Sequence, residues 1–162
     1  MYRYIVYLHI LGALGFMIAH GASASMAFRL RKEKDMDRIR AMLDLSGFPT
    51  MIMYLSLLVL LVAGVTLGFM GHWWNRGWIW TSIGLFLAIA ILMGVLGQRH
   101  YHGLRKLVGM PYFEGSKEQP AIEPASQGEI EAKISESRPI FLSMVGFGGI
   151  ALILWLMMFK PF

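Results

Sequence analysis

The 162-residue chain contains no cysteine. This absence excludes disulfide bonds, iron–sulfur clusters, thiolate metal sites and covalently attached c-type haem. Charge is also scarce, because Asp, Glu, Lys and Arg make up 15% of the chain, whereas a soluble domain carries roughly 25%. The longest stretches without any of these residues lie between Arg3 and Arg29, Asp44 and Arg76, Arg76 and Arg99, and Arg138 and Lys160.

These stretches are filled by apolar residues, and hydrophobic residues account for 56% of the chain. Each stretch exceeds the roughly 20 residues that a helix needs to cross about 30 Å of hydrocarbon. The stretches lack the alternation of membrane β-strands, and backbone groups in lipid must be hydrogen-bonded within their own helix. The sequence therefore predicts an all-α protein, an integral membrane four-helix bundle that forms a single domain over residues 1–162. The predicted helices cover about 4–28, 49–72, 78–98 and 139–159.

Basic residues predict the orientation of this bundle. Of the 15 Lys and Arg residues, 12 fall in the connections 29–48 and 99–138. The positive-inside rule places both connections in the cytoplasm, and therefore both termini and the short 73–77 turn outside. The excess of five positive charges follows this topology, so it gives no indication of nucleic-acid binding. Tyrosine and tryptophan gather near the predicted outer ends of the helices, which is typical of an interfacial belt and also compatible with a contact surface for a partner.

Two connecting segments have features of their own. In 35–46, apolar residues recur at helical spacing among charged ones, which predicts an amphipathic helix on the membrane surface or continuing the first span. Pro49 suits the first turn of the helix that follows. In the cytoplasmic loop 99–138, the part 109–128 is rich in Pro, Gly and Ser and is predicted to be irregular, followed by a short polar helix over 129–137.

Small residues recur four positions apart in the predicted spans. Examples are Gly64 and Gly68 in the second span, and Ala19, Ser23 and Ala27 in the first. Helices in lipid associate through close contact between such residues. The pattern supports a compact bundle, and the same faces are candidates for binding another membrane subunit or a second copy of the chain.

No Asp, Glu, Lys or Arg lies within the predicted spans, so histidine is the only group there that titrates near neutral pH. Ion-coupled transporters and proton pumps keep charged residues at depth, and a transport mechanism of that kind is therefore disfavoured. The sequence contains neither a nucleophile–base–acid arrangement nor a Gly-rich phosphate loop. It names no catalytic residue, and enzymatic activity of this chain on its own is not indicated.

Four histidines are arranged in two predicted layers. His9 and His20 are eleven residues apart on the first helix, so they face nearly the same direction at a separation of about 16 Å. His72 ends the second helix at the level of His9, and His100 ends the third helix on the side of His20. Stacked bis-histidine sites for haem b need this layering. His9, His20, His72 and His100 are therefore candidate haem or metal ligands, with a single haem on one pair, or methionine as an alternative axial ligand, as further options.

A purely structural interpretation of the histidines stands beside the haem hypothesis. His72, His100 and His102 lie at helix ends, where histidine is commonly solvated. His9 can hydrogen-bond to a neighbouring helix. His20 is deepest, and a polar group at that depth needs a partner. The 13 methionines favour core and lipid-facing packing over a copper path.

The segment Leu8-His9-Ile10-Leu11-Gly12-Ala13, followed by a basic amphipathic segment, resembles the start of bacterial integral membrane proteins grouped with the copper-resistance D-like superfamily. That superfamily also includes the membrane protoporphyrinogen oxidase. The resemblance covers residues 4–108 and implies a four-helix bacterial inner-membrane protein, with His9 at the position of the family's first-helix histidine. Some relatives are associated with haem or copper. This chain differs from the pattern in its long 109–138 loop and in the absence of charged residues from its spans.

The leading hypothesis is a haem-b-binding electron-transfer component of a redox or energy-transducing membrane complex. The alternative is a cofactor-free accessory subunit of a larger membrane complex, and the third is copper handling through His and Met. The expected partners are the lipid bilayer and other membrane subunits or a second copy of the chain. The expected location is the bacterial inner membrane.

Overall fold

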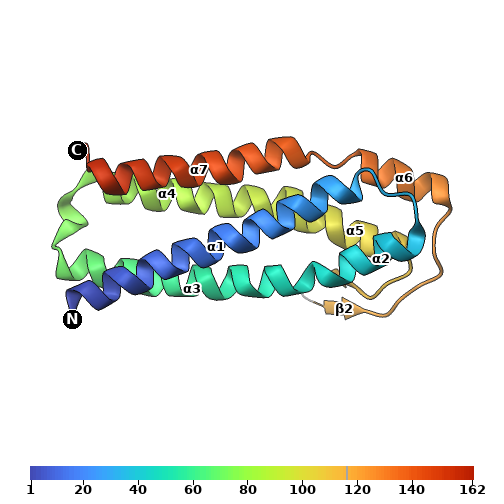
Figure 1. Cartoon of the computed structure of the whole chain (residues 1–162), viewed down its shortest axis with the longest axis horizontal. Coiled ribbons are helices and arrows are strands. Elements are labelled where there is room, and N and C mark those ends of the chain that lie inside the picture. The colour runs from blue at the N-terminus through green and yellow to red at the C-terminus, as the bar shows by residue number, and fades with distance from the viewer. Residues whose placement is uncertain (116) are drawn as a thin grey trace.

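Four long apolar helices dominate the computed structural model, which describes residues 1–115 and 117–162, with the side chain of Gln98 left out. The long helices are α1 (Tyr2–Leu30), α3 (Gly47–Met70), α4 (Gly77–Met93) and α7 (Pro139–Phe159). They run side by side along the longest axis of the molecule (Figure 1). The described residues contain four helical stretches that are long and apolar enough to cross a membrane. The predicted all-α bundle of four membrane helices is confirmed.

The long helices associate as two pairs, α1 with α3 and α4 with α7. Glycine allows the first pair to approach closely. A Cβ atom at Gly12 would lie 3.1 Å from the backbone nitrogen of Leu60 and 3.2 Å from the carbonyl oxygen of Ser56. Such short distances leave little room for a side chain, so the backbone of α1 at Gly12 lies close to the backbone of α3, as expected for helices that associate in lipid.

Both chain termini lie at one end of the bundle, here called the termini end (Figure 1). The short helix η1 (Trp73–Asn75) joins α3 to α4 at this end. It follows His72, whose backbone is left-handed at φ 53°. The ammonium group of Lys160 lies 4.2 Å from the ring centroid of Trp73 and 5.6 Å from that of Trp78, which ties the end of α7 to this turn.

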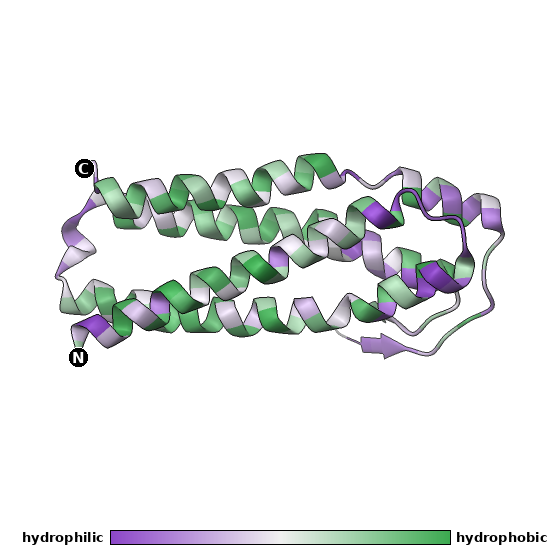
Figure 2. Ribbon diagram, viewed as in Figure 1, coloured by the Kyte–Doolittle hydropathy of each residue, from purple (hydrophilic) through white to green (hydrophobic). Residues whose placement is uncertain are grey.

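The opposite end, here called the basic end, carries a folded polar cap. Its elements are α2 (Met36–Leu45), α5 (Arg99–Leu107), the hairpin strands β1 (Tyr112–Glu114) and β2 (Lys117–Gln119), and α6 (Gln127–Ser135). Figure 2 shows hydrophilic residues concentrated here and hydrophobic residues along the four long helices. The cap has a core of its own, made of Leu30, Ile39, Leu43, Leu104, Val108, Ile130 and Ile134. This core joins the end of α1 to α2, α5 and α6.

The segments that form the cap agree with the sequence-based predictions in part. The predicted amphipathic helix 35–46 is present as α2, with the Asp35 side chain accepting from the backbone N–H groups of Asp37 and Arg38. The third span was predicted to end at 98, but the π-helical stretch η2 (Gly94–Gln98) carries it on into α5. The predicted irregular part contains the β1–β2 hairpin. The predicted polar helix 129–137 corresponds to α6, which begins earlier at a capping box between Ser126 and Glu129.

Candidate functional site

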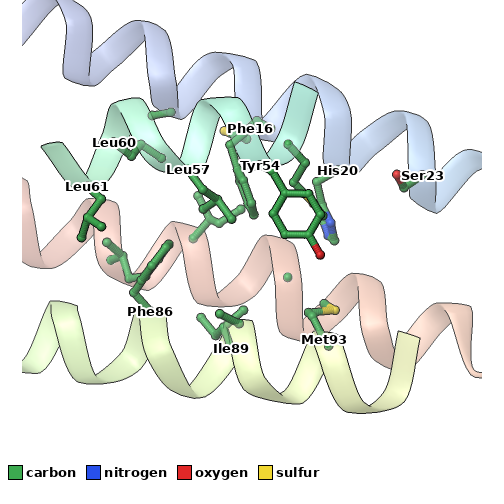
Figure 3. Close-up of a pocket in the computed structure, with 18 of the residues that line it drawn as sticks. Phe16, His20, Ser23, Tyr54, Leu57, Leu60, Leu61, Phe86, Ile89 and Met93 are labelled. Carbon is green, nitrogen blue, oxygen red and sulfur yellow. The ribbon is translucent and has the colours of Figure 1, made fainter. Parts of the chain in front are cut away.

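A cavity of about 1460 Å³ lies between the two helix pairs and is lined by residues of all four long helices. Ligand sites usually occupy about 300–1,000 Å³, so this space is large enough for a sizeable cofactor. Its lining is mostly apolar, with aromatic and branched side chains such as Phe16, Leu57, Phe86 and Ile89 facing one another across it (Figure 3). Helix bundles build ligand and cofactor sites in their core from side chains on facing helices, and this cavity occupies that position.

His9 lines this cavity from α1, and its ring is held by α3. Its Nδ1 atom lies 3.2 Å from the carbonyl oxygen of Leu60. Because a carbonyl oxygen only accepts, Nδ1 carries the proton and donates it, which leaves Nε2 with a free lone pair. Gly64 makes room for the ring, since a Cβ there would lie 3.2 Å from Cε1 of His9. A backbone bond that fixes the tautomer in this way is typical of histidines that ligate metals.

His20 lies further along the same face of α1 and also lines the cavity (Figure 3). Its ring stacks on Phe16 at 6.0 Å between centroids and meets the edge of Phe147 at 4.8 Å. The ring packs directly on Gly146 of α7, where any Cβ would overlap Nε2. Nε2 of His20 is buried without a hydrogen-bond partner among the described residues. An unpartnered buried imidazole nitrogen is costly, so this atom needs an explanation.

Each of these histidines has a methionine at its level on the opposite helix pair. Near His20, the methyl carbon of Met93 lies 3.0 Å from the Cβ position of Gly146, the glycine on which the ring packs. α1 and α7 run antiparallel, and eleven residues separate both His20 from His9 and Gly146 from Met157. At 1.5 Å per residue both steps are about 16 Å, which brings Met157 to the level of His9. Met93 and Met157 both line the cavity.

The other candidate ligands lie elsewhere. His72 is exposed in the turn at the termini end, and His100 lies on α5 in the cap; neither is among the described residues that line the cavity. Nε2 of His100 is buried without a hydrogen-bond partner in the described part of the chain, and its ring meets the edge of Tyr101. His102 lines the cap end of the cavity, with its ring against Phe113. The structure therefore gathers His9 and His20 around one cavity and sets His72 and His100 apart from it.

The described residues contain no group of three or more His, Asp or Glu side chains that could hold a metal ion. A metal site in the bundle would therefore use one or two imidazoles. The cofactor itself would supply the remaining ligands, as the porphyrin does for haem iron. Comparison with family models, curated proteins and solved structures found no match to this chain. The arguments about function rest on the geometry of the site.

Proposed function

We propose that this chain is a membrane-embedded haem-b-binding protein that carries electrons, and that His9 is the residue that would hold the haem in the central cavity. The observation that carries the proposal is the hydrogen bonding and position of the His9 ring. Its Nδ1 is bonded to the carbonyl oxygen of Leu60, and its ring borders a large apolar cavity. Porphyrin is a large, flat, mostly apolar ring, and neutral imidazole is a standard ligand of its iron.

The surroundings of His9 support this assignment. Gly64 leaves space beside the imidazole, and Met157 provides a thioether at the same level on the other side of the cavity. Lys160 is the one charged side chain that lines the termini end of the cavity among the described residues, and its ammonium suits a propionate. His20 and Met93 repeat the pairing about 16 Å away and form a second candidate position.

Haem bound there would supply one-electron redox chemistry between a reduced donor and an oxidised acceptor. The protein's own contribution is the dry apolar lining and the choice of ligands, which together set the reduction potential. A methionine as the second ligand in place of a second histidine would raise that potential. The resemblance of the first helix to a superfamily with haem-associated members is in line with the proposal.

An absorption spectrum of the purified full chain tests the proposal. The protein is produced in haem-sufficient cells, extracted in mild detergent and measured after oxidation and after reduction with dithionite. We expect a Soret band that shifts on reduction, together with a sharpened α band. If no Soret band appears, and none develops when haem is added to the purified protein, the haem proposal is wrong.

One observation favours the alternative of an accessory subunit. Gly84 on α4 and Gly148 on α7 are exposed, and a Cβ at either position would meet nothing within 4 Å. Small residues on an exposed face permit close approach of a further transmembrane helix. These two positions are therefore candidate contacts for another membrane subunit. This role is compatible with haem binding, because the exposed glycines lie outside the cavity lining.

The distribution of charge supports one orientation in the membrane. Because the basic end carries 12 of the 15 Lys and Arg residues, we propose that it faces the cytoplasm. The absence of cysteine makes this easy to test. In intact cells, Asn75→Cys is expected to react with a membrane-impermeant maleimide, whereas Glu118→Cys is expected to react only after lysis. The reverse labelling pattern would show the opposite orientation.

A further inference from the structure

A second pocket, of about 500 Å³, lies at the basic end of the bundle. It forms where the end of α1 meets the connection between α6 and α7. Arg31 enters from just beyond α1, and Ser137 and Arg138 enter from the connection. The pocket is separate from the central cavity, because the two share no lining residue in the described part of the chain.

The polar part of this pocket has an unbalanced positive charge. Glu136 is its one acidic residue among the described lining, and its Oε2 accepts a hydrogen bond of 2.7 Å from Nζ of Lys133. This bond holds the pKa of the Glu136 carboxyl below its usual range, so the carboxylate is ionised and paired. Arg31 and Arg138 form no ion pair within the described residues. Two guanidinium groups therefore remain for an anion, and guanidinium is well suited to phosphate.

The other part of the pocket is apolar and continues onto the membrane-spanning surface. Ile140, Phe141 and Met144 occupy the first two turns of α7 and complete the lining. Their exposed fractions are 61%, 46% and 71%, so these side chains are open to the surroundings of the helix. A free phosphate ion would leave this apolar wall unused. A molecule with a phosphate at one end and hydrocarbon at the other would cover both parts.

We propose that this pocket binds an anionic phospholipid, with the headgroup phosphate between Arg31 and Arg138 and an acyl chain along Ile140, Phe141 and Met144. The pocket lies where a lipid of the adjoining leaflet places its headgroup, at the boundary between a basic polar cap and an apolar helix surface. Basic pockets between helices at this boundary are suited to anionic headgroups. A zwitterionic lipid brings its own cation to the same place, and repulsion between that cation and the two arginines offsets part of the attraction to its phosphate.

Native mass spectrometry of the full chain in detergent tests the proposal, with phosphatidylglycerol and phosphatidylcholine as probes. We expect phosphatidylglycerol to be retained about tenfold more strongly than phosphatidylcholine. The double variant Arg31→Gln/Arg138→Gln is expected to lower retention of phosphatidylglycerol about tenfold. Arg31→Lys/Arg138→Lys keeps the charge and is expected to retain most of the binding.

The matched control is Arg29→Gln/Arg99→Gln, which removes two exposed arginines of the same end that do not line the pocket. It is expected to change lipid retention less than about twofold. Equal losses in the two glutamine double variants would overturn the proposal in favour of diffuse attraction to the basic end. Displacement of the lipid by millimolar glycerol 3-phosphate would overturn it in favour of a free phosphate site. If the double variant does not fold, retention of phosphatidylglycerol is measured in the single variants Arg31→Gln and Arg138→Gln, and each is expected to retain less than the parent protein.

Discussion

The variant His9→Ala is expected to lose its haem, with the Soret absorbance per protein falling at least about tenfold. The substitution removes the Nε2 lone pair and leaves the apolar lining in place, so haem would keep only non-directional contacts. The measurement is the absorbance ratio of the Soret band to the protein band, together with a pyridine haemochrome assay of haem per chain. Losing the bond to Leu60 should cost only about 1 kcal/mol of stability, so the bundle is expected to remain folded.

His72→Ala is the matched control, because His72 is a histidine at the same end of the bundle that is exposed and outside the cavity lining. It should keep the full haem content. Met157→Leu should keep the haem as well but change its spectrum and lower its potential, since the thioether is replaced by a hydrocarbon of similar size. Full haem retention in His9→Ala would exclude His9 as the ligand. Loss of haem in both His9→Ala and His72→Ala would favour the bis-histidine pair His9 and His72.

The second large effect is expected from Gly12→Leu. The added side chain would start 3.1–3.2 Å from backbone atoms of Leu60 and Ser56, and backbone of a packed helix cannot move aside as a flexible side chain can. Forcing extra atoms into a packed contact costs about 1–3 kcal/mol or more. The contact involves Leu60, which also holds His9, so haem content should fall together with thermal stability. The measurement is a thermal melt in detergent combined with the Soret ratio.

Gly84→Leu is the control for this substitution. It adds the same side chain to a transmembrane helix at a position where a Cβ meets nothing within 4 Å. Its melting temperature in detergent should stay within a few degrees of the parent protein, and its haem content should not change. If Gly12→Leu melts no earlier than Gly84→Leu, the close packing of α1 on α3 is not what holds this pair together. A lower stability of Gly84→Leu only in native membranes would point to a partner helix at this face.

The four spans could be predicted from the sequence because the membrane imposes one requirement on every residue of a span. Long runs without charge, such as the one between Arg3 and Arg29, have no other stable conformation in lipid. The cap was harder to foresee. Its core joins residues as distant as Leu30, Leu104 and Ile134, and no local pattern reveals that these apolar positions share one cluster. The continuation of α4 into α5 was missed because the apolar run ends at Arg99 although the helix does not.

The candidate site was only partly predictable for a related reason. Eleven-residue spacing on one helix is enough to place His9 and His20 on a common face, and the structure has them line one cavity. Which side chains lie across the cavity from these histidines depends on how the helices pair. No local sequence pattern shows that pairing. Glycine was the one informative signal. Gly64 stands beside His9 and Gly146 beside His20, so these two glycines lie where the imidazole rings need space. The methionines at the same levels gave no signal among 13 such residues.

The two helix pairs enclose the central cavity incompletely. Lipid acyl chains can therefore compete with any other molecule for this space. Leu61, Leu87 and Leu154 line the cavity and are nevertheless 58%, 53% and 43% exposed, so the space is open toward the surroundings of the bundle. In a bilayer those surroundings are acyl chains, which are as apolar as the lining itself. Transfer of a hydrophobic molecule from lipid into this cavity therefore gains almost nothing from the hydrophobic effect. Selectivity has to come from directional bonds that a hydrocarbon chain cannot form, and the imidazoles of His9 and His20 are two groups of the lining that can form them.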